Sequence, residues 1–121
     1  MASIFVVSSD DDVKYYPLGR RNNVIGRDAT VPIQIVDKKI SRKHMQIRYD
    51  QSEECFFIID MNSRNGVFIN GKKIEEETVL ADGDRIGVGD AEILFTLKDF
   101  PKRENALHHF KKVGQNKMTT E

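Results

Sequence analysis

The sequence predicts an all-β protein: a two-sheet antiparallel sandwich of short strands. Three observations predict it. About ten short apolar or alternating segments follow one another closely, turn residues separate them, and no helical pattern interrupts them. The strand period is clearest in His44–Tyr49, where apolar and polar residues alternate. Asn70-Gly71 between two such segments is typical of a type I′ hairpin turn, which needs two positive φ angles. Asp82-Gly83 indicates a further turn.

The expected strands share β-rich composition and lie between turn residues. They are Ile4–Val7, Val13–Leu18, Val24–Ile25, Ile33–Val36, His44–Tyr49, Cys55–Ile59, Val67–Ile69, Lys72–Ile74, Arg85–Val88 and Ala91–Leu97. Pro17 cannot donate to a neighbouring strand and indicates an edge position. The run Cys55–Ile59 is continuously apolar, which is typical of an interior strand, and Cys55 is expected in the core.

The C-terminal part of the chain has a different pattern. Leu107, Phe110 and Val113 recur at helical spacing, with Pro101 near the start of the segment. We therefore expect a short helix over 101–113 and a loose polar tail after it. The chain divides into a sandwich over residues 1–99 and a helix and tail over residues 100–121.

Composition limits the class of protein. The chain has 121 residues, 39% of them hydrophobic and 31% charged, which suits one globular domain. Its 19 basic and 19 acidic residues cancel, which argues against nucleic acid or anionic membrane as partners. No apolar run is long enough to span a membrane, and the start lacks the features of a secretory signal. A single cysteine suits a reducing compartment, so we expect a cytoplasmic protein, or a nuclear one in a eukaryote.

A basic loop stands out against this neutral background. Four of the six residues from Lys38 to Lys43 are cationic, and Ser41 adds a hydroxyl. Arg27 offers a planar fork of donors that can hold two phosphate oxygens. Asn65 has both an amide donor and an acceptor, which suits a peptide backbone. Together these side chains predict a phosphate or phosphopeptide site.

The order of these motifs resembles that of the forkhead-associated (FHA) domain family. The matching residues are Gly26-Arg27, Ser41-Arg42-Lys43-His44, Asp60-Met61-Asn62-Ser63-Arg64-Asn65-Gly66, Asn70-Gly71, and Leu80 with Asp82-Gly83-Asp84. The resemblance covers about residues 3–98. It implies a sandwich of about eleven strands that binds phosphothreonine peptides on the loops at one end, as FHA domains recognise phosphorylated motifs.

The resemblance also implies a role for each matching residue. Arg27 and Ser41 would bind the phosphate, with Arg42 and Arg64 assisting. Asn65 would hydrogen-bond the main chain of the peptide. The implied partners are phosphothreonine-containing substrates of Ser/Thr kinases, recruited in signalling.

Three further residues would be architectural. Gly26 would let the backbone turn, and a buried His44 would tie loop to loop. Gly66 is the third structural residue. Val67 departs from the family pattern, which commonly has threonine there, and this could change the packing beneath the site.

Other functions remain as alternatives. The domain could bind proteins without needing phosphate, or a phosphorylated Thr119 or Thr120 could occupy its own site. A hydrolase triad of Ser41, His44 and Asp60 is disfavoured because no nucleophile elbow is present. The histidines and the cysteine lack metal-ligand spacing, so we expect no metal, no cofactor and no enzymatic activity.

Overall fold

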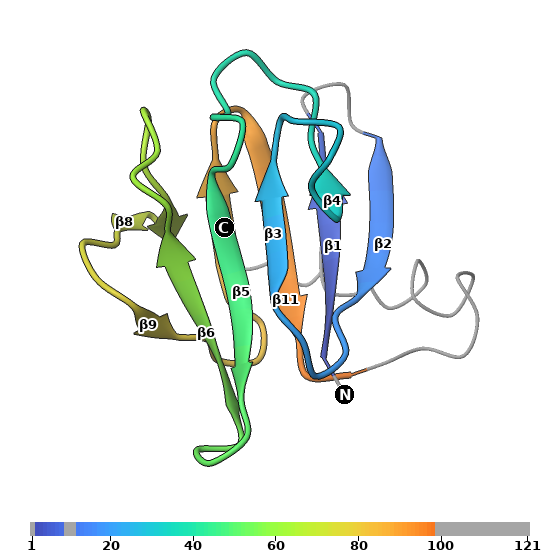
Figure 1. Ribbon diagram of the computed structural model, residues 1–121, viewed down its shortest axis with the longest axis vertical. Helices are drawn as coiled ribbons and strands as arrows, with labels where there is room; N and C mark the ends of the chain where they lie inside the picture. The colour runs from blue at the N-terminus through green and yellow to red at the C-terminus, as the bar shows by residue number, and fades with distance from the viewer. Residues whose placement is uncertain (1, 9–11, 99–121) are drawn as a thin grey trace, which may run out of the picture.

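The computed structural model describes residues 2–8 and 12–98, which form two packed β-sheets (Figure 1). The strands are β1 (Ser3–Val7), β2 (Val13–Pro17), β3 (Asn23–Gly26), β4 (Ile33–Gln34), β5 (Met45–Asp50), β6 (Cys55–Asp60), β7 (Phe68–Ile69), β8 (Lys72–Lys73), β9 (Thr78–Val79), β10 (Arg85–Val88) and β11 (Ala91–Thr96). The predicted sandwich of about eleven strands is confirmed.

The strand order interleaves early and late parts of the chain. One sheet has six strands in the order β2-β1-β11-β10-β7-β8, and the other has five in the order β4-β3-β5-β6-β9. Strand β2 is an edge strand, as Pro17 predicts. One pairing departs from the predicted antiparallel arrangement, because β3 and β4 pair in parallel. Here Ile35 N donates to Gly26 O at 2.8 Å, so the short β4 lies against the outer edge of β3.

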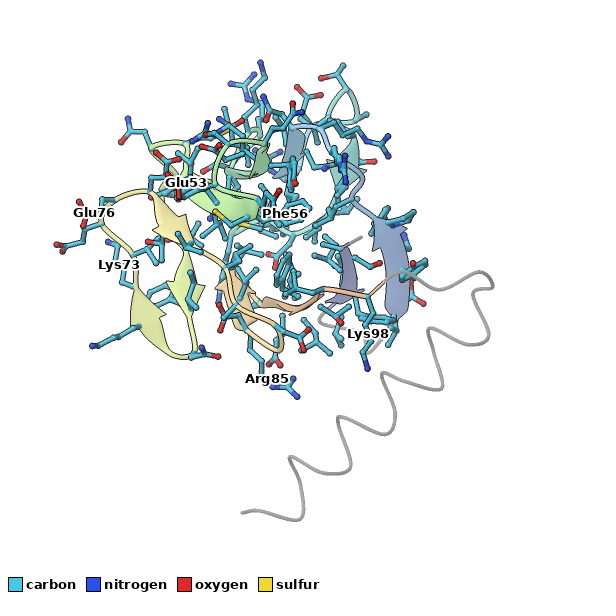
Figure 2. The ribbon with its side chains drawn as sticks, turned by 90° about the horizontal axis from the view of Figure 1, so that it is seen from below. Glu53, Phe56, Lys73, Glu76, Arg85 and Lys98 are labelled. Carbon is cyan, nitrogen blue, oxygen red and sulfur yellow. The ribbon has the colours of Figure 1, made fainter. Side chains whose placement is uncertain are left out.

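The core lies between the two sheets. Alternate residues of each strand face inward, as the period of two requires. In β1 these are Ile4 and Val6, and in β5 they are Met45 and Ile47, all at most 2% exposed. Phe56 lies between the layers (Figure 2), where its ring centre is 5.7 Å from that of Phe95 in an edge-on contact.

The hairpin prediction is confirmed. Asn70 has a φ of 51° and Gly71 a φ of 85°, the two positive values that a type I′ turn needs. The sequence did not predict β9, because Thr78 and Val79 follow three glutamates and show no apolar alternation. This strand depends on its partner: Val79 lies opposite Phe57 in β6, and Leu80 N donates to Phe56 O at 2.8 Å.

Cys55 is not in the core, contrary to prediction. Phe56 and Ile58 face inward, so alternation places Cys55 and Phe57 on the outer side of β6. Although residues 55–59 are all apolar, only one face of β6 is therefore buried in the core. The guanidinium of Arg48 instead covers Phe57, 5.4 Å from the ring centre.

Two predictions lie outside the described residues: the helix over 101–113 and the separate C-terminal segment 100–121. Within residues 2–8 and 12–98, no helix is long and apolar enough to cross a membrane.

Candidate functional site

Three loops meet at one end of the sandwich, the upper end in Figure 1: those joining β3 to β4, β4 to β5, and β6 to β7. Backbone hydrogen bonds fasten them together. Arg27 N donates to Ser41 O at 3.0 Å, and His44 N donates to Ile25 O at 2.9 Å. Met61 N donates to His44 O at 2.9 Å. The β4–β5 loop is thus held on both sides.

Gly26 is required by close packing rather than by a turn. It is absent from the residues with positive φ, so the expectation that it lets the backbone turn is wrong. A Cβ atom at this position would lie 2.0 Å from the carbonyl oxygen of Arg42. Real Cβ atoms do not approach a backbone oxygen so closely. Glycine is what allows the β3–β4 and β4–β5 loops to touch.

His44 is fully buried and joins two loops, as predicted. Its Nδ1 accepts the backbone N–H of Ser41 at 3.0 Å. An accepting nitrogen carries no proton, so the neutral ring is the Nε2–H tautomer. Nε2 then donates to Gly66 O at 2.7 Å. Both ring nitrogens are satisfied inside the protein, and the ring links the β4–β5 and β6–β7 loops.

Two successive carbonyl groups orient two of the predicted site residues. The Nε of Arg27 donates to Ile40 O at 3.0 Å, which leaves the far side of the guanidinium outward. The amide nitrogen of Asn65 donates to Lys39 O at 2.7 Å. Both side chains are exposed. Hydrogen bonds to two successive carbonyl groups of one turn therefore orient them at the surface.

Ser41 follows Ile40 in the chain, and its side chain is held by the β6–β7 loop. Its Oγ accepts the backbone N–H of Arg64 at 3.0 Å. A serine hydroxyl can donate one hydrogen bond while it accepts others. The contact with Arg64 uses acceptor capacity only, so the hydroxyl hydrogen is available to a bound anion.

Arg27, Ser41 and Arg64 share a small pocket of about 80 Å³. It is lined by Arg27, Lys38, Lys39, Ile40, Ser41 and Arg64, with no carboxylate. Ion pairs between described residues use Lys39, Arg48 and Arg85. The charges of Arg27, Arg64 and Lys38 are thus uncompensated within the part of the chain that the structure describes. Uncompensated cations around a hydroxyl favour an anionic ligand.

Two other predicted residues lie beside the pocket rather than in its wall. Asn65 touches the pocket-lining Lys39 through the bond above. Arg42 is exposed and is not among the lining residues. The backbone carbonyl of Arg42 instead helps to join the two loops. It accepts the N–H of Asp28 at 3.2 Å and packs against Gly26.

The loop that carries Arg64 and Asn65 is ordered by its own side chains. Ser63 N donates to Asp60 Oδ1, and Gly66 N donates to Ser63 Oγ, both at 3.0 Å. Gly66 has a φ of 80°, which suits glycine. Val67, at the position of the family's threonine, is fully buried in the main core.

A brace behind the site was not predicted. Asp37 Oδ2 accepts the N–H of Asp90 at 2.8 Å, and Asp37 Oδ1 accepts the N–H of Lys39 at 2.9 Å. The ammonium of Lys39 pairs with Asp90 Oδ1 at 3.0 Å. A Cβ at Gly89 would lie 2.8 Å from Ile40 Cγ1. The β10–β11 turn therefore supports the loop whose carbonyl groups orient Arg27 and Asn65. The sequence signals were weak: an Asp before two lysines, and an ordinary Gly-Asp turn.

Larger hollows lie elsewhere, two of them of about 530 and 770 Å³ along β7, β8 and β10. Their walls mix acidic and basic residues, unlike the cation-lined pocket. Among residues 2–8 and 12–98, no three His, Cys, Asp or Glu side chains gather in a way that could hold a metal ion.

The two-sheet sandwich and the cation-lined pocket on its end loops are together the features of a binding module. The chain is a member of the FHA family, because the family model described as "FHA domain" matches residues 23–89. The predicted resemblance is confirmed.

Relatives and solved structures agree. The chain is 34% identical over 92 residues to the FHA domain-containing protein FhaA of Mycobacterium tuberculosis, covering 76% of this chain and 17% of FhaA. The mouse angiogenic factor with G patch and FHA domains 1 is 25% identical over 101 residues, covering 78% of this chain and 13% of that protein. The chain thus spans less than a fifth of these relatives.

Two solved structures are similar over nearly their whole length. The FhaA FHA domain complexed with the intracellular domain of Rv3910 has a TM-score of 0.69 and 30% identity, covering 78% of this chain and 99% of that one. A structure from an analysis of phosphothreonine-dependent FHA domain interactions has a TM-score of 0.70 and 32% identity, covering 81% and 99%.

Proposed function

We propose that this domain binds phosphothreonine peptides and recruits phosphorylated partner proteins. Membership of the FHA family supports the proposal, as do phosphothreonine-dependent interactions in the analysis that produced a similar structure. The partners would be substrates of Ser/Thr kinases, met in the cytoplasm. The FhaA domain bound to the intracellular domain of Rv3910 supports such a protein partner.

One observation carries the proposal: residues 39, 40 and 41 organise three ligand groups in sequence. The carbonyl of Lys39 holds Asn65, the carbonyl of Ile40 holds Arg27, and Ser41 supplies its own hydroxyl. A phosphate in the pocket would meet the outer nitrogens of Arg27 and the hydroxyl of Ser41. Asn65 is held by Lys39, the residue before Ile40, and we place the peptide main chain beside it.

The proposed roles follow this arrangement. Arg27 and Ser41 bind phosphate oxygens, and Arg64 contributes charge from the pocket wall. Asn65 uses its carbonyl oxygen and remaining N–H on the peptide backbone. Arg42, on the rim, attracts acidic residues of the ligand. Charge-assisted hydrogen bonds contribute about 1.5–3 kcal/mol each, less ordering costs, which gives affinities in the micromolar range, about −8 kcal/mol.

We propose no catalysis at this site. A general base must be able to take a proton from the nucleophile. His44 accepts the backbone N–H of Ser41 at Nδ1 and faces Gly66 O at Nε2, so neither nitrogen meets the Ser41 hydroxyl. Asp60 is engaged by the backbone N–H of Ser63. These contacts support a site that holds a phosphate without transferring it.

An oriented phosphothreonine peptide library tests the function. The full chain is expected to select phosphothreonine peptides over the same peptides with phosphoserine or unmodified threonine. A matched Arg27→Ala chain should lose the selection. Equal binding of phosphorylated and unmodified peptides would instead identify a phosphate-independent interaction module.

A further inference from the structure

Strand β4 forms a free edge of the five-stranded sheet, beside the candidate site (Figure 1). Within residues 2–8 and 12–98 it pairs with β3 alone. Gln34 lies opposite Gly26 in this parallel pair, and Gly26 O accepts the N–H of Ile35. In a parallel ladder, Gln34 at such a position directs its own N–H and C=O away from the partner strand. The N–H of Val36 is two residues further on, so alternation directs it outward as well.

The residues of this edge suit a longer strand than they form. Residues 33–36 are β-branched at three of four positions, yet β4 ends at Gln34. The side chain of Val36 is 83% exposed. Sheet edges that avoid pairing carry lysine or proline. Strand β8 consists of Lys72 and Lys73, and β2 ends at Pro17. Residues 33–36 include neither residue type, so this edge is suited to accept a further strand.

A hollow of about 240 Å³ lies against the same edge. Residues 34–36 line it on the side of β4, and on the side of β1 and β2 it is lined by Val6, Ser8, Asp12 and Lys14. When an extended peptide adds to a sheet edge, main-chain hydrogen bonds hold it, and hollows beside the edge take alternate side chains. The β4 edge offers both features.

The edge is continuous with the cation-lined pocket. Lys38 of the pocket wall is four residues after Gln34, at most about 13 Å along an extended chain. Gln34 Nε2 also donates to Arg27 O at 3.0 Å. The strand order β4-β3-β5-β6 puts β4 next to the strand that precedes Arg27, whereas Asn65 follows β6. A peptide that passes Asn65 and then the pocket therefore reaches β4 next.

We propose that a bound phosphopeptide adds one of its flanks to β4 as a further strand of this sheet. The inference rests on the proposed function, because phosphothreonine in the pocket delivers the flank to the edge. That flank lies on the other side of phosphothreonine from the residues at Asn65. Its main chain bonds to the N–H and C=O of Gln34 and to the N–H of Val36, and one of its side chains enters the hollow. The partner then needs a β-prone segment that begins within about four residues of phosphothreonine.

Peptide length tests the proposal on the wild-type chain. A short probe has about three residues on each side of phosphothreonine. Two extended probes add a glycine that lets the chain bend, then about six residues of alternating valine and threonine, one at the N-terminal and one at the C-terminal end. Fluorescence anisotropy should show about fivefold tighter binding for one extended probe, because a few hydrogen bonds are added. The other should bind as the short probe does.

The outcomes separate this inference from the proposed function. Equal affinity of all three probes overturns the added strand, and so does an equal gain for both extensions, which would indicate contact without direction. The short probe with and without its phosphate tests the function itself. If the phosphate makes no difference there, the proposed function fails.

N-methylation of the extension locates the added strand. Every second N–H of a strand faces the same neighbour. N-methyl groups should therefore weaken binding at alternate residues of the tighter probe and leave it unchanged at the residues between. A loss at every position, or at none, overturns the proposal.

Val36→Pro and Val36→Ala are matched variants of the edge. Val36→Pro removes the outward N–H, which β3 does not use, whereas Val36→Ala shortens the side chain and keeps that N–H. Val36→Pro should reduce the advantage of the extended probe over the short one, and Val36→Ala should keep most of it. The same advantage in both variants contradicts the pairing. If Val36→Pro also weakens the short probe, the N-methyl pattern with the wild-type chain decides.

Discussion

The carbonyl oxygen of Arg42 lies where a side chain on Gly26 would have to be, 2.0 Å from an ideal Cβ. This contact brings the β3–β4 loop against the β4–β5 loop, and it places Arg27 beside Ser41. The arrangement of the candidate site therefore depends on the absence of one carbon atom at Gly26.

Gly26→Ala should lower the free energy of unfolding by about 1–3 kcal/mol, the usual cost of overpacking a close contact. Thermal or urea unfolding measures it. Gly87→Ala is the matched control, because its Cβ would meet only Phe68 Cβ at an ordinary 3.6 Å. Equal stability of the two variants would contradict the role assigned to Gly26.

Arg27→Ala should weaken phosphopeptide binding at least about tenfold, or about 1.4 kcal/mol. Arg27→Lys keeps the charge but loses the planar fork and the bond to Ile40, so it should fall in between. Titration by calorimetry or fluorescence anisotropy measures both. Arg21→Ala removes the same charge outside the site and should bind as the wild type does. A wild-type affinity for Arg27→Ala would refute the site.

Asp37→Ala should remove the brace behind the site and lower phosphopeptide affinity about fivefold. Asp37 accepts two backbone N–H groups, and the hydrogen bond from Asp90, which joins the loop to the β10–β11 turn, contributes about 1 kcal/mol. Asp82→Ala is the comparison, because Asp82 Oδ1 accepts a backbone N–H, that of Leu97, away from the site. Both variants should lose some stability. Only Asp37→Ala should lose affinity, and a similar loss in both would mean that the brace does not act on the site.

Phosphopeptide affinity should fall as the pH drops below about 6, where the phosphate dianion takes up a proton. The monoanion carries less charge and has an oxygen that no longer accepts from Arg27. Binding measured between about pH 7.5 and about pH 5 should show the loss. A peptide with a glutamate in place of phosphothreonine is the control, and a flat profile for the phosphopeptide would argue against recognition of the dianion.

Cys55 should react slowly with iodoacetamide. Desolvation raises the pKa of its thiol, and the carboxylates of Asp50 and Glu53 raise it further. The thiolate is the form that reacts with iodoacetamide. At about pH 8 the folded chain therefore holds a smaller fraction of thiolate than the unfolded chain, and its alkylation rate should rise at higher pH. Glu53→Gln should speed alkylation modestly, and Glu75→Gln should not. Equal rates in folded and unfolded chains would contradict the raised pKa.

Much of the fold was readable from local pattern. Ten of the eleven strands were predicted within a few residues, because apolar alternation and turn residues are local signals. The exception was β9, whose two residues are held by their partner strand β6. Cys55 was misplaced for a related reason: a continuous apolar run does not reveal which of its two faces is covered.

The candidate site also has a part that the sequence revealed and a part that only the fold revealed. Arg27, Ser41, Arg64 and Asn65 were selected by residue type and order, and the fold brings them to one end. The contacts that aim them come from backbone carbonyls of Lys39 and Ile40, and a carbonyl group carries no sequence signal. The supporting Asp37 and Gly89 were missed because their partners are about fifty residues apart in the chain.

The sequence by itself determined the sandwich, the family and the identity of the candidate ligand groups, since each depends on side-chain chemistry or on a period along the chain. Only the tertiary structure decided why Gly26 must be glycine, which ring nitrogen of His44 accepts a hydrogen bond, and that the Ser41 hydroxyl keeps its hydrogen for a ligand. Those properties depend on distances between loops that the chain brings together only when the two sheets pack.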